Sequence, residues 1–151
     1  MKIPKKIPEI QLRYSFRVKR ADRVQVRNSK DLFHALLSIW DHDTLDYREM
    51  FIALYLNRCN YVLGYRIISI GGVAGTVVDA RQVLAIAIKA NASAIVLAHN
   101  HPSGQNLPSS QDIELTRKIK AGGDLLDISV LDHLILTSDD AYFSFADEGL
   151  M

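Results

Sequence analysis

The sequence predicts one domain of the α/β (or α+β) class, in which a mixed β-sheet is flanked by helices. The chain has 151 residues, of which 48% are hydrophobic and 23% are charged, so it can bury a core of ordinary size in a single domain. Segments with strand patterns are interspersed along the chain with segments of helical character. One short buried strand is predicted between two helices, an order typical of a sheet with helices packed on its faces.

The first half of the chain is predicted to supply three strands and one helix. Residues 11–18 alternate in part between apolar and polar side chains, which predicts a half-buried strand. Ser29 is a candidate N-cap for a helix over residues 30–39. Residues 50–56 are apolar without interruption, which suits a strand buried on both faces. Residues 62–70 are rich in β-branched side chains and predict the hairpin partner of that strand.

The second half alternates between helices and strands. Asp79 is a candidate cap for a helix over residues 80–90, which leads into a short buried strand over residues 94–98. Two further strands are predicted over residues 130–137 and 142–145. The helix over residues 80–90, the strand over residues 94–98 and a second helix over residues 110–121 together predict three layers.

A capping motif marks the start of that remaining helix. Ser109 is the candidate N-cap of a helix over residues 110–121, and Asp112 follows Ser109 at close to the spacing of a capping box. Gly122 and Gly123 are expected to end the helix, because glycine is common just beyond helix C-termini.

The composition excludes several classes of protein. The apolar content rules out disorder as the main state, and no run approaches the roughly 20 apolar residues of a membrane span. Cys59 is the only cysteine, so neither an internal disulfide nor a zinc cage built from thiols can form. Residues 1–10 show no apolar stretch of the kind that signal peptides need. These features predict a cytoplasmic protein without a membrane partner.

The charge is unevenly distributed. The net charge of the chain is +1, yet residues 1–30 carry ten basic and two acidic side chains. Such a basic stretch is a candidate DNA-binding arm. The alternative interpretation is a solvated edge strand whose charges discourage aggregation and complement an acidic body.

Two histidines and an aspartate form the candidate metal site. His99 and His101 lie two residues apart at the end of a predicted strand, so both rings can project to one side of an extended chain. Asp112 follows in the first turn of the next helix. Two histidines and one carboxylate, with a fourth position left for water, are the ligands of a catalytic zinc site. Each residue also has an interpretation without a metal. The histidines can lie in a turn with their rings in solvent, and Asp112 can stand in the first turn because a negative charge there interacts favourably with the helix dipole.

A zinc site that activates water also needs a group that takes the proton from that water. Glu49 is the candidate, because it immediately precedes the apolar run over residues 50–56, and a charged side chain next to a buried strand is unusual unless it has a function. The alternative is a solvated side chain at the start of a strand. A fifth side chain, His133, lies in an apolar strand and is interpreted as a core or strand-edge histidine, with support of the metal ligands as the alternative.

The spacing of these residues resembles the JAMM signature of the JAB/MPN metallopeptidase-like family. The signature consists of His99-x-His101, seven further residues, Ser109, two residues and Asp112, with Glu49 in the position of the upstream glutamate. The closer resemblance is to the RadC-like branch. It rests on residues 97–104, Pro108-Ser109, residues 112–116, and the tail segments 131–135 and 142–146.

The resemblance implies a fold similar to that of cytidine deaminases, and zinc ligation by His99, His101 and Asp112. It further implies that Glu49 acts as the acid/base and that Ser109 helps to place the polarised water or the oxyanion. The wider family cleaves peptide or isopeptide bonds, which makes an isopeptide-linked protein a candidate substrate. The single cysteine excludes the ligand pattern of the zinc deaminases.

The RadC-like branch carries a DNA-repair label, and its longer members have an N-terminal helix-hairpin-helix region. We expect a basic strand and helix in residues 1–45 instead, packed on a metal-binding core over residues 46–151. The expectation of DNA binding therefore rests on the basic stretch over residues 1–30. The alternative to an enzyme is a metal-containing module without catalytic activity that binds DNA or a protein partner.

Overall fold

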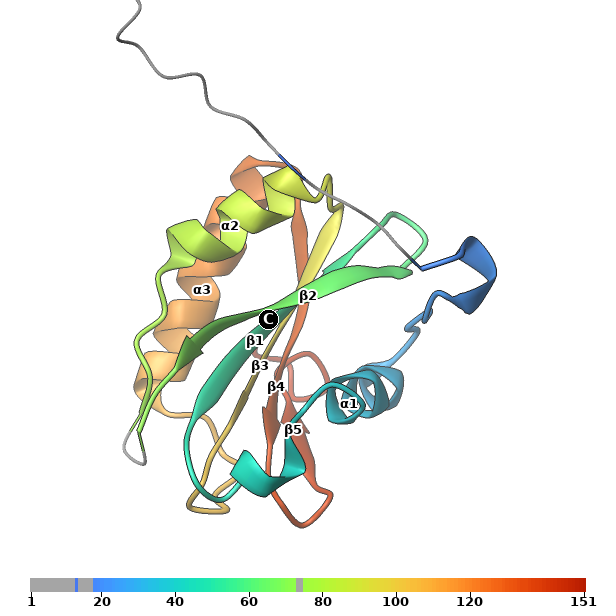
Figure 1. Cartoon of the computed structure of the whole chain (residues 1–151). Coiled ribbons are helices and arrows are strands. Elements are labelled where there is room, and N and C mark those ends of the chain that lie inside the picture. The colour runs from blue at the N-terminus through green and yellow to red at the C-terminus, as the bar shows by residue number, and fades with distance from the viewer. Residues whose placement is uncertain (1–12, 14–17, 73–74) are drawn as a thin grey trace, which may run out of the picture.

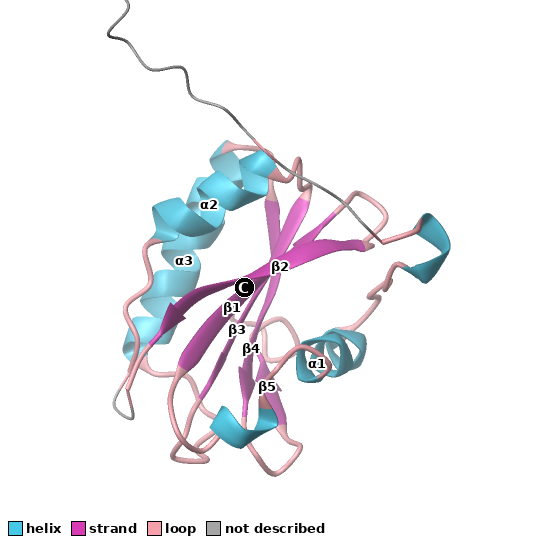
Figure 2. Cartoon of the chain, viewed as in Figure 1, coloured by secondary structure: helices cyan, strands magenta, loops and turns pink. Residues whose placement is uncertain are grey.

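Five strands form one open mixed sheet, with the order β2-β1-β3-β4-β5 (Figures 1 and 2). The computed structural model describes residues 13, 18–72 and 75–151, so the strand predicted over residues 11–18 and the first lysines of the basic stretch lie almost entirely outside the described residues. The strands are β1 (Met50–Leu56), β2 (Val62–Ile70), β3 (Ala94–Asn100), β4 (Ser129–Leu136) and β5 (Tyr142–Ser144). β3 and β4 run parallel, and the other neighbouring pairs are antiparallel.

Helices cover both faces of this sheet, which confirms the predicted α/β class. α1 (Ser29–Leu37) lies on one face, and α2 (Ala80–Lys89) and α3 (Ser110–Leu125) lie on the other (Figure 1). Two short 3-10 turns, η1 (Arg20–Asp22) and η2 (His42–Thr44), flank α1 along the chain. Within the described ranges, none of the helices combines the length and the hydropathy that crossing a membrane requires.

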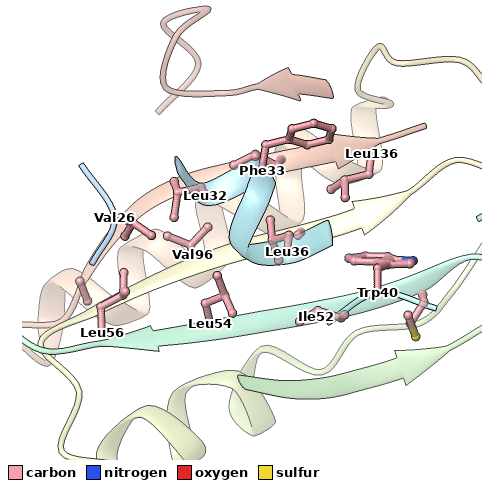
Figure 3. Packing of buried hydrophobic residues seen from close by; sticks show 14 of the residues in the cluster. Val26, Leu32, Phe33, Leu36, Trp40, Ile52, Leu54, Leu56, Val96 and Leu136 are labelled. Carbon is pink, nitrogen blue, oxygen red and sulfur yellow. The ribbon is translucent and has the colours of Figure 1, made fainter. Parts of the chain in front are cut away.

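The position of β1 explains its uninterrupted apolar sequence. Every second side chain from Met50 to Leu56 belongs to the buried cluster beneath α1, part of which Figure 3 shows. The intervening side chains Phe51, Ala53 and Tyr55 belong to the cluster beneath α2 and α3. Because both faces of the strand are covered, no position on β1 is left for a polar side chain. The predicted bounds of β1 and β2 are confirmed.

The start of α1 differs from the prediction by one residue. Asn28, and not Ser29, is the N-cap: its backbone is extended, and its side-chain oxygen accepts a hydrogen bond from the backbone N–H of Asp31 at 2.8 Å. Ser29 is already helical, and its hydroxyl donates to the carboxylate of Asp147 at 2.5 Å. Both residues are good caps in isolation, so the choice depends on a partner 118 residues away in the sequence.

The prediction that Gly122 and Gly123 end a helix is wrong, because α3 continues through both to Leu125. The two glycines serve close packing instead. A Cβ atom on Gly122 would lie 2.6 Å from a methyl carbon of Leu84 in α2, and one on Gly123 would overlap the backbone oxygen of Ile128. The absence of side chains at these two positions therefore allows α3 to approach both α2 and the segment that leads into β4.

The central strand β3 extends two residues beyond the predicted end. His99 pairs with Phe51 of β1, and Asn100 pairs with Leu136 of β4, so the neighbouring strands hold both residues in the sheet. The prediction ended the strand at residue 98 because the polar side chains that follow are unusual in a buried strand. This extension places the first candidate ligand inside the sheet.

We predict that Gly123→Ala destabilises the fold by about 1–3 kcal/mol, because the added methyl group needs space that the Ile128 carbonyl occupies. This is the net change, after the roughly 1 kcal/mol that alanine gains over glycine inside a helix is subtracted from the cost of the clash. Urea unfolding followed by circular dichroism measures the change. Gly64→Ala is the matched control, because a Cβ atom there meets open space. Equal stability of the two variants would contradict the packing role.

Candidate metal centre

Three elements bring the predicted ligands together at the carboxyl end of β3. His99 lies in the strand, His101 follows the strand end, and Asp112 lies in the first turn of α3. One ligand atom from each residue lies within 4.8 Å of the other two. The two histidine Nε2 atoms are 2.9 Å apart, and carboxylate oxygens of Asp112 lie 3.3 Å from that of His99 and 3.6 Å from that of His101. Among the described residues, this is the group of histidine and acidic side chains that could hold a metal ion.

The hydrogen bonds of His101 indicate which ring nitrogen faces the cluster. Its Nδ1 lies 2.6 Å from the backbone oxygen of Gln105. A carbonyl oxygen only accepts, so Nδ1 carries the hydrogen and donates it. The Nε2 atom of the neutral ring therefore presents its lone pair to His99 and Asp112. Such an arrangement of acceptors requires a proton or a cation between them.

Electrostatics at the cluster favour positive charge. Burial raises the pKa of Asp112, but the interactions with His101 and His99 outweigh this effect and hold the pKa well below its usual range. The hydrogen bond to Asp112 raises the pKa of His101, against the lowering effect of burial. The carboxylate and the two ring nitrogens thus form an electronegative cluster, and a metal ion bound there would compete with protons for the same atoms.

Glu49 lines the same cavity as two of the candidate ligands. The cavity has a volume of 310 Å³ and is lined by Glu49, His101, Ser109 and Asp112, among others. The backbone of Glu49 forms two hydrogen bonds with the loop after β2, at 3.1 Å to the oxygen of Gly72 and at 2.8 Å from the N–H of Gly71. Burial raises the pKa of the Glu49 carboxyl, and the nearby His99 lowers it. The Glu49 side chain is therefore half-buried and lies near enough to the candidate ligands for their charges to affect its pKa.

Ser109 is the N-cap of α3, as predicted, within a complete capping box. Its hydroxyl donates to a carboxylate oxygen of Asp112 at 2.7 Å, and its backbone N–H donates to the same oxygen at 2.7 Å. In return, the hydroxyl oxygen accepts from the backbone N–H of Asp112 at 3.1 Å. Ser109 therefore orients a candidate ligand as well as starting the helix.

Asn100 is a buried residue of the site whose role the sequence left open. Its side chain projects to the α1 face, opposite to His99. It accepts a hydrogen bond from the N–H of Met50 at 2.8 Å and donates to the oxygens of Leu45 and Arg48 at 2.8 and 2.9 Å. These three bonds tie the segment that carries Glu49 to the strand that carries the histidines.

His133 is buried, as interpreted from the sequence, but it also contacts a ligand. Its Nε2 lies 2.8 Å from Nδ1 of His99, and its Nδ1 lies 2.6 Å from the hydroxyl of Thr116 in α3. The parallel register places His133 beside Leu97, so its ring projects to the same face as His99. This register establishes the contact that the sequence offered only as an alternative. Thr116 belongs to the segment 112–116 on which the family resemblance rests, but nothing in the sequence indicated its contact with His133.

The site residues lie within the part of the chain that matches known proteins. Residues 26–150 match the profile of the RadC-like JAB domain. A UPF0758 protein of Flavobacterium johnsoniae is 41% identical over 126 residues, which are 83% of this chain and 53% of that protein. A UPF0758 protein of Porphyromonas gingivalis is 47% identical over 107 residues, which are 71% and 47% of the two chains. The chain spans about half the length of these curated relatives.

We predict that Asn100→Ala destabilises the protein by about 2–4 kcal/mol, because it leaves one buried N–H and two carbonyl oxygens without their partner. Thermal or urea unfolding measures the loss. Asn106→Ala, at an exposed position of the following loop, is the control and should stay within about 0.5 kcal/mol of the parent. A loss no larger than that of the control would show that the segment before β1 is held in place by other contacts.

Proposed function

Because the chain belongs to the RadC-like JAB domain family, we propose that it is a zinc-dependent hydrolase of peptide or isopeptide bonds. The proposal is supported above all by the convergence of two imidazole nitrogens and a carboxylate on one point, with Glu49 lining the same cavity as His101 and Asp112. The wider JAB/MPN family includes hydrolases of this kind. The proposed substrates are therefore defined by the bond that is cleaved, a peptide or isopeptide bond.

The donor set fits zinc. Imidazole nitrogen and carboxylate oxygen suit zinc, whereas magnesium and calcium prefer oxygen ligands alone. Three protein ligands leave a further coordination position toward the cavity, as in catalytic zinc sites. Zinc bound by His99, His101 and Asp112 would polarise a carbonyl group and bring the pKa of a water molecule to about 7.

The remaining chemistry belongs to side chains of the protein. We assign the general base to the Glu49 carboxylate, which takes a proton from water and delivers it to the nitrogen of the leaving amine. The effect of burial on its pKa suits this role, because a carboxylate with a raised pKa holds a proton more readily. Ser109 keeps Asp112 oriented and lies beside the cavity; to contact the oxyanion, its hydroxyl would turn from Asp112 to the substrate.

A second candidate function is a binding module for DNA or for a protein partner. The observation in its favour is the basic stretch over residues 1–30. DNA binding through this stretch would weaken steeply with salt, since each phosphate contact releases counterions. Replacing Lys2, Lys5 and Lys6 by glutamine removes three of the ten basic side chains and should then weaken retention on immobilised DNA. Unchanged retention would contradict this function.

We predict about one zinc ion per chain in protein purified without a metal-affinity tag. Elemental analysis should show its loss in His101→Ala and Asp112→Ala, with the fold retained in circular dichroism. Glu49→Gln should keep the zinc and lose roughly 10²- to 10⁴-fold in cleavage of fluorogenic peptides or of lysine ε-linked isopeptides.

The three variants separate the parts of the proposal. A parent protein that takes up no zinc at neutral pH would rule out the hydrolase. Zinc uptake with full activity of Glu49→Gln would retain the metal site and remove Glu49 from the chemistry. Equal zinc content in the parent, His101→Ala and Asp112→Ala would place the metal elsewhere.

A further inference from the structure

Behind the candidate ligand His99, three buried side chains form a continuous chain of hydrogen bonds. Nδ1 of His99 lies 2.8 Å from Nε2 of His133, and Nδ1 of His133 lies 2.6 Å from the hydroxyl of Thr116. The hydroxyl donates to the backbone oxygen of Asp112 at 2.6 Å. Thr116, His99 and His133 are 2%, 1% and 0% exposed. This series of hydrogen bonds links β3, β4 and α3, and it ends at Asp112, the residue that supplies the carboxylate ligand.

The direction of each hydrogen bond in this chain follows from its last member. A hydroxyl has one hydrogen, and that of Thr116 is donated to a carbonyl oxygen, which cannot donate in return. Thr116 must therefore accept from Nδ1–H of His133. Nε2 of His133 is then an acceptor, so Nδ1 of His99 carries a hydrogen. Only Nε2 of His99 retains a lone pair, and this atom faces His101 and Asp112.

We propose that Thr116 and His133 are positioning residues that select the tautomer and the ring orientation in which His99 binds the metal. The proposal rests on the metal site of the proposed function. We refer to the pair as the Thr116–His133 relay. Neither residue touches the reacting atoms; the relay acts through His99. It starts from the backbone of Asp112, so the turn of α3 that supplies one ligand also orients another.

The packing around His133 holds the relay in place. Its ring stacks on Phe145 with centroids 4.7 Å apart, and it meets the ring of Phe51 edge-on at 5.5 Å. Phe51 in turn stacks on His99 at 6.0 Å. In such apolar surroundings a lost hydrogen-bond partner is costly, so the polar atoms of the relay depend strongly on one another.

The other histidine ligand is oriented differently. Nδ1 of His101 donates to the backbone oxygen of Gln105 in an exposed loop. The relay therefore controls only one of the two imidazoles. Its loss should weaken metal binding without removing any ligand, which distinguishes the relay from the ligands themselves.

The zinc affinity of paired variants tests the relay. Thr116→Val removes the hydroxyl at nearly constant volume, and Thr116→Ser keeps it. His133→Phe removes both ring nitrogens, and His133→Gln keeps one acceptor and one donor. Competition with a chromophoric chelator at neutral pH should show zinc affinity lowered roughly 10- to 100-fold in Thr116→Val and His133→Phe. Thr116→Ser and His133→Gln should recover most of that loss.

The alternative explanation of weaker zinc binding is a general loss of stability. In that case the unfolding midpoints of Thr116→Val and Thr116→Ser would both fall, and the zinc affinity of Thr116→Ser would not recover. Equal zinc affinity of Thr116→Val and Thr116→Ser, both folded, overturns the proposal. If His133→Phe does not fold, the Thr116 pair alone decides the outcome.

Nitrogen-15 NMR of the imidazoles separates this proposal from the proposed function. We expect His133 in its Nδ1–H form in the metal-free and the zinc-loaded protein, and His99 in its Nδ1–H form once zinc is bound. An Nε2–H form of His133 overturns the relay. If the parent protein takes up no zinc, the hydrolase fails, and the form of His133 in the metal-free protein still decides whether the relay exists.

Discussion

The burial of β3 on both faces is the constraint from which the organisation of the site follows. The strand lies between β1 and β4 and beneath helices on each side, yet it ends in the polar residues His99 and Asn100. Buried polar groups need partners inside the protein, since water cannot reach them. Alternation along the strand sends the two side chains to opposite faces, so each recruits a different part of the fold. His99 contacts the relay beneath α3, and Asn100 binds the segment ahead of β1.

This division explains how a small domain can preorganise a site made from distant segments. Hydrogen bonds between the Asn100 side chain and the main chain of the segment that carries Glu49 tie that segment to the ligand strand. Ser109 orients Asp112 from the N-terminus of α3, and the glycines near the other end of α3 let the helix lie close to α2 and to the segment before β4. The position of the candidate base Glu49 and the positions of the candidate ligands are therefore coupled through β3 and α3. Such coupling limits the rearrangement needed when a metal binds.

The matched family and the site coincide in sequence. Residues 26–150 match the RadC-like JAB domain and include every residue of the cluster, the relay and the Asn100 contacts. The relatives from Flavobacterium johnsoniae and Porphyromonas gingivalis extend over about twice the matched length. The residues of the proposed chemistry therefore all lie within the matched domain.

Local patterns in the sequence were sufficient for the features that depend on neighbours along the chain. They predict β1 and β2 to the residue, the caps Asp79 and Ser109, and the grouping of His99, His101 and Asp112, because strand alternation and helix capping act over a few residues. Features that depend on register between distant segments emerged only in the folded protein. Asn28 caps α1 while Ser29 contacts Asp147, α3 continues through Gly122 and Gly123, and His133 meets His99 across β3 and β4. The physical reason is that close packing and buried hydrogen bonds are properties of pairs of surfaces, and a single segment of sequence describes only one member of each pair.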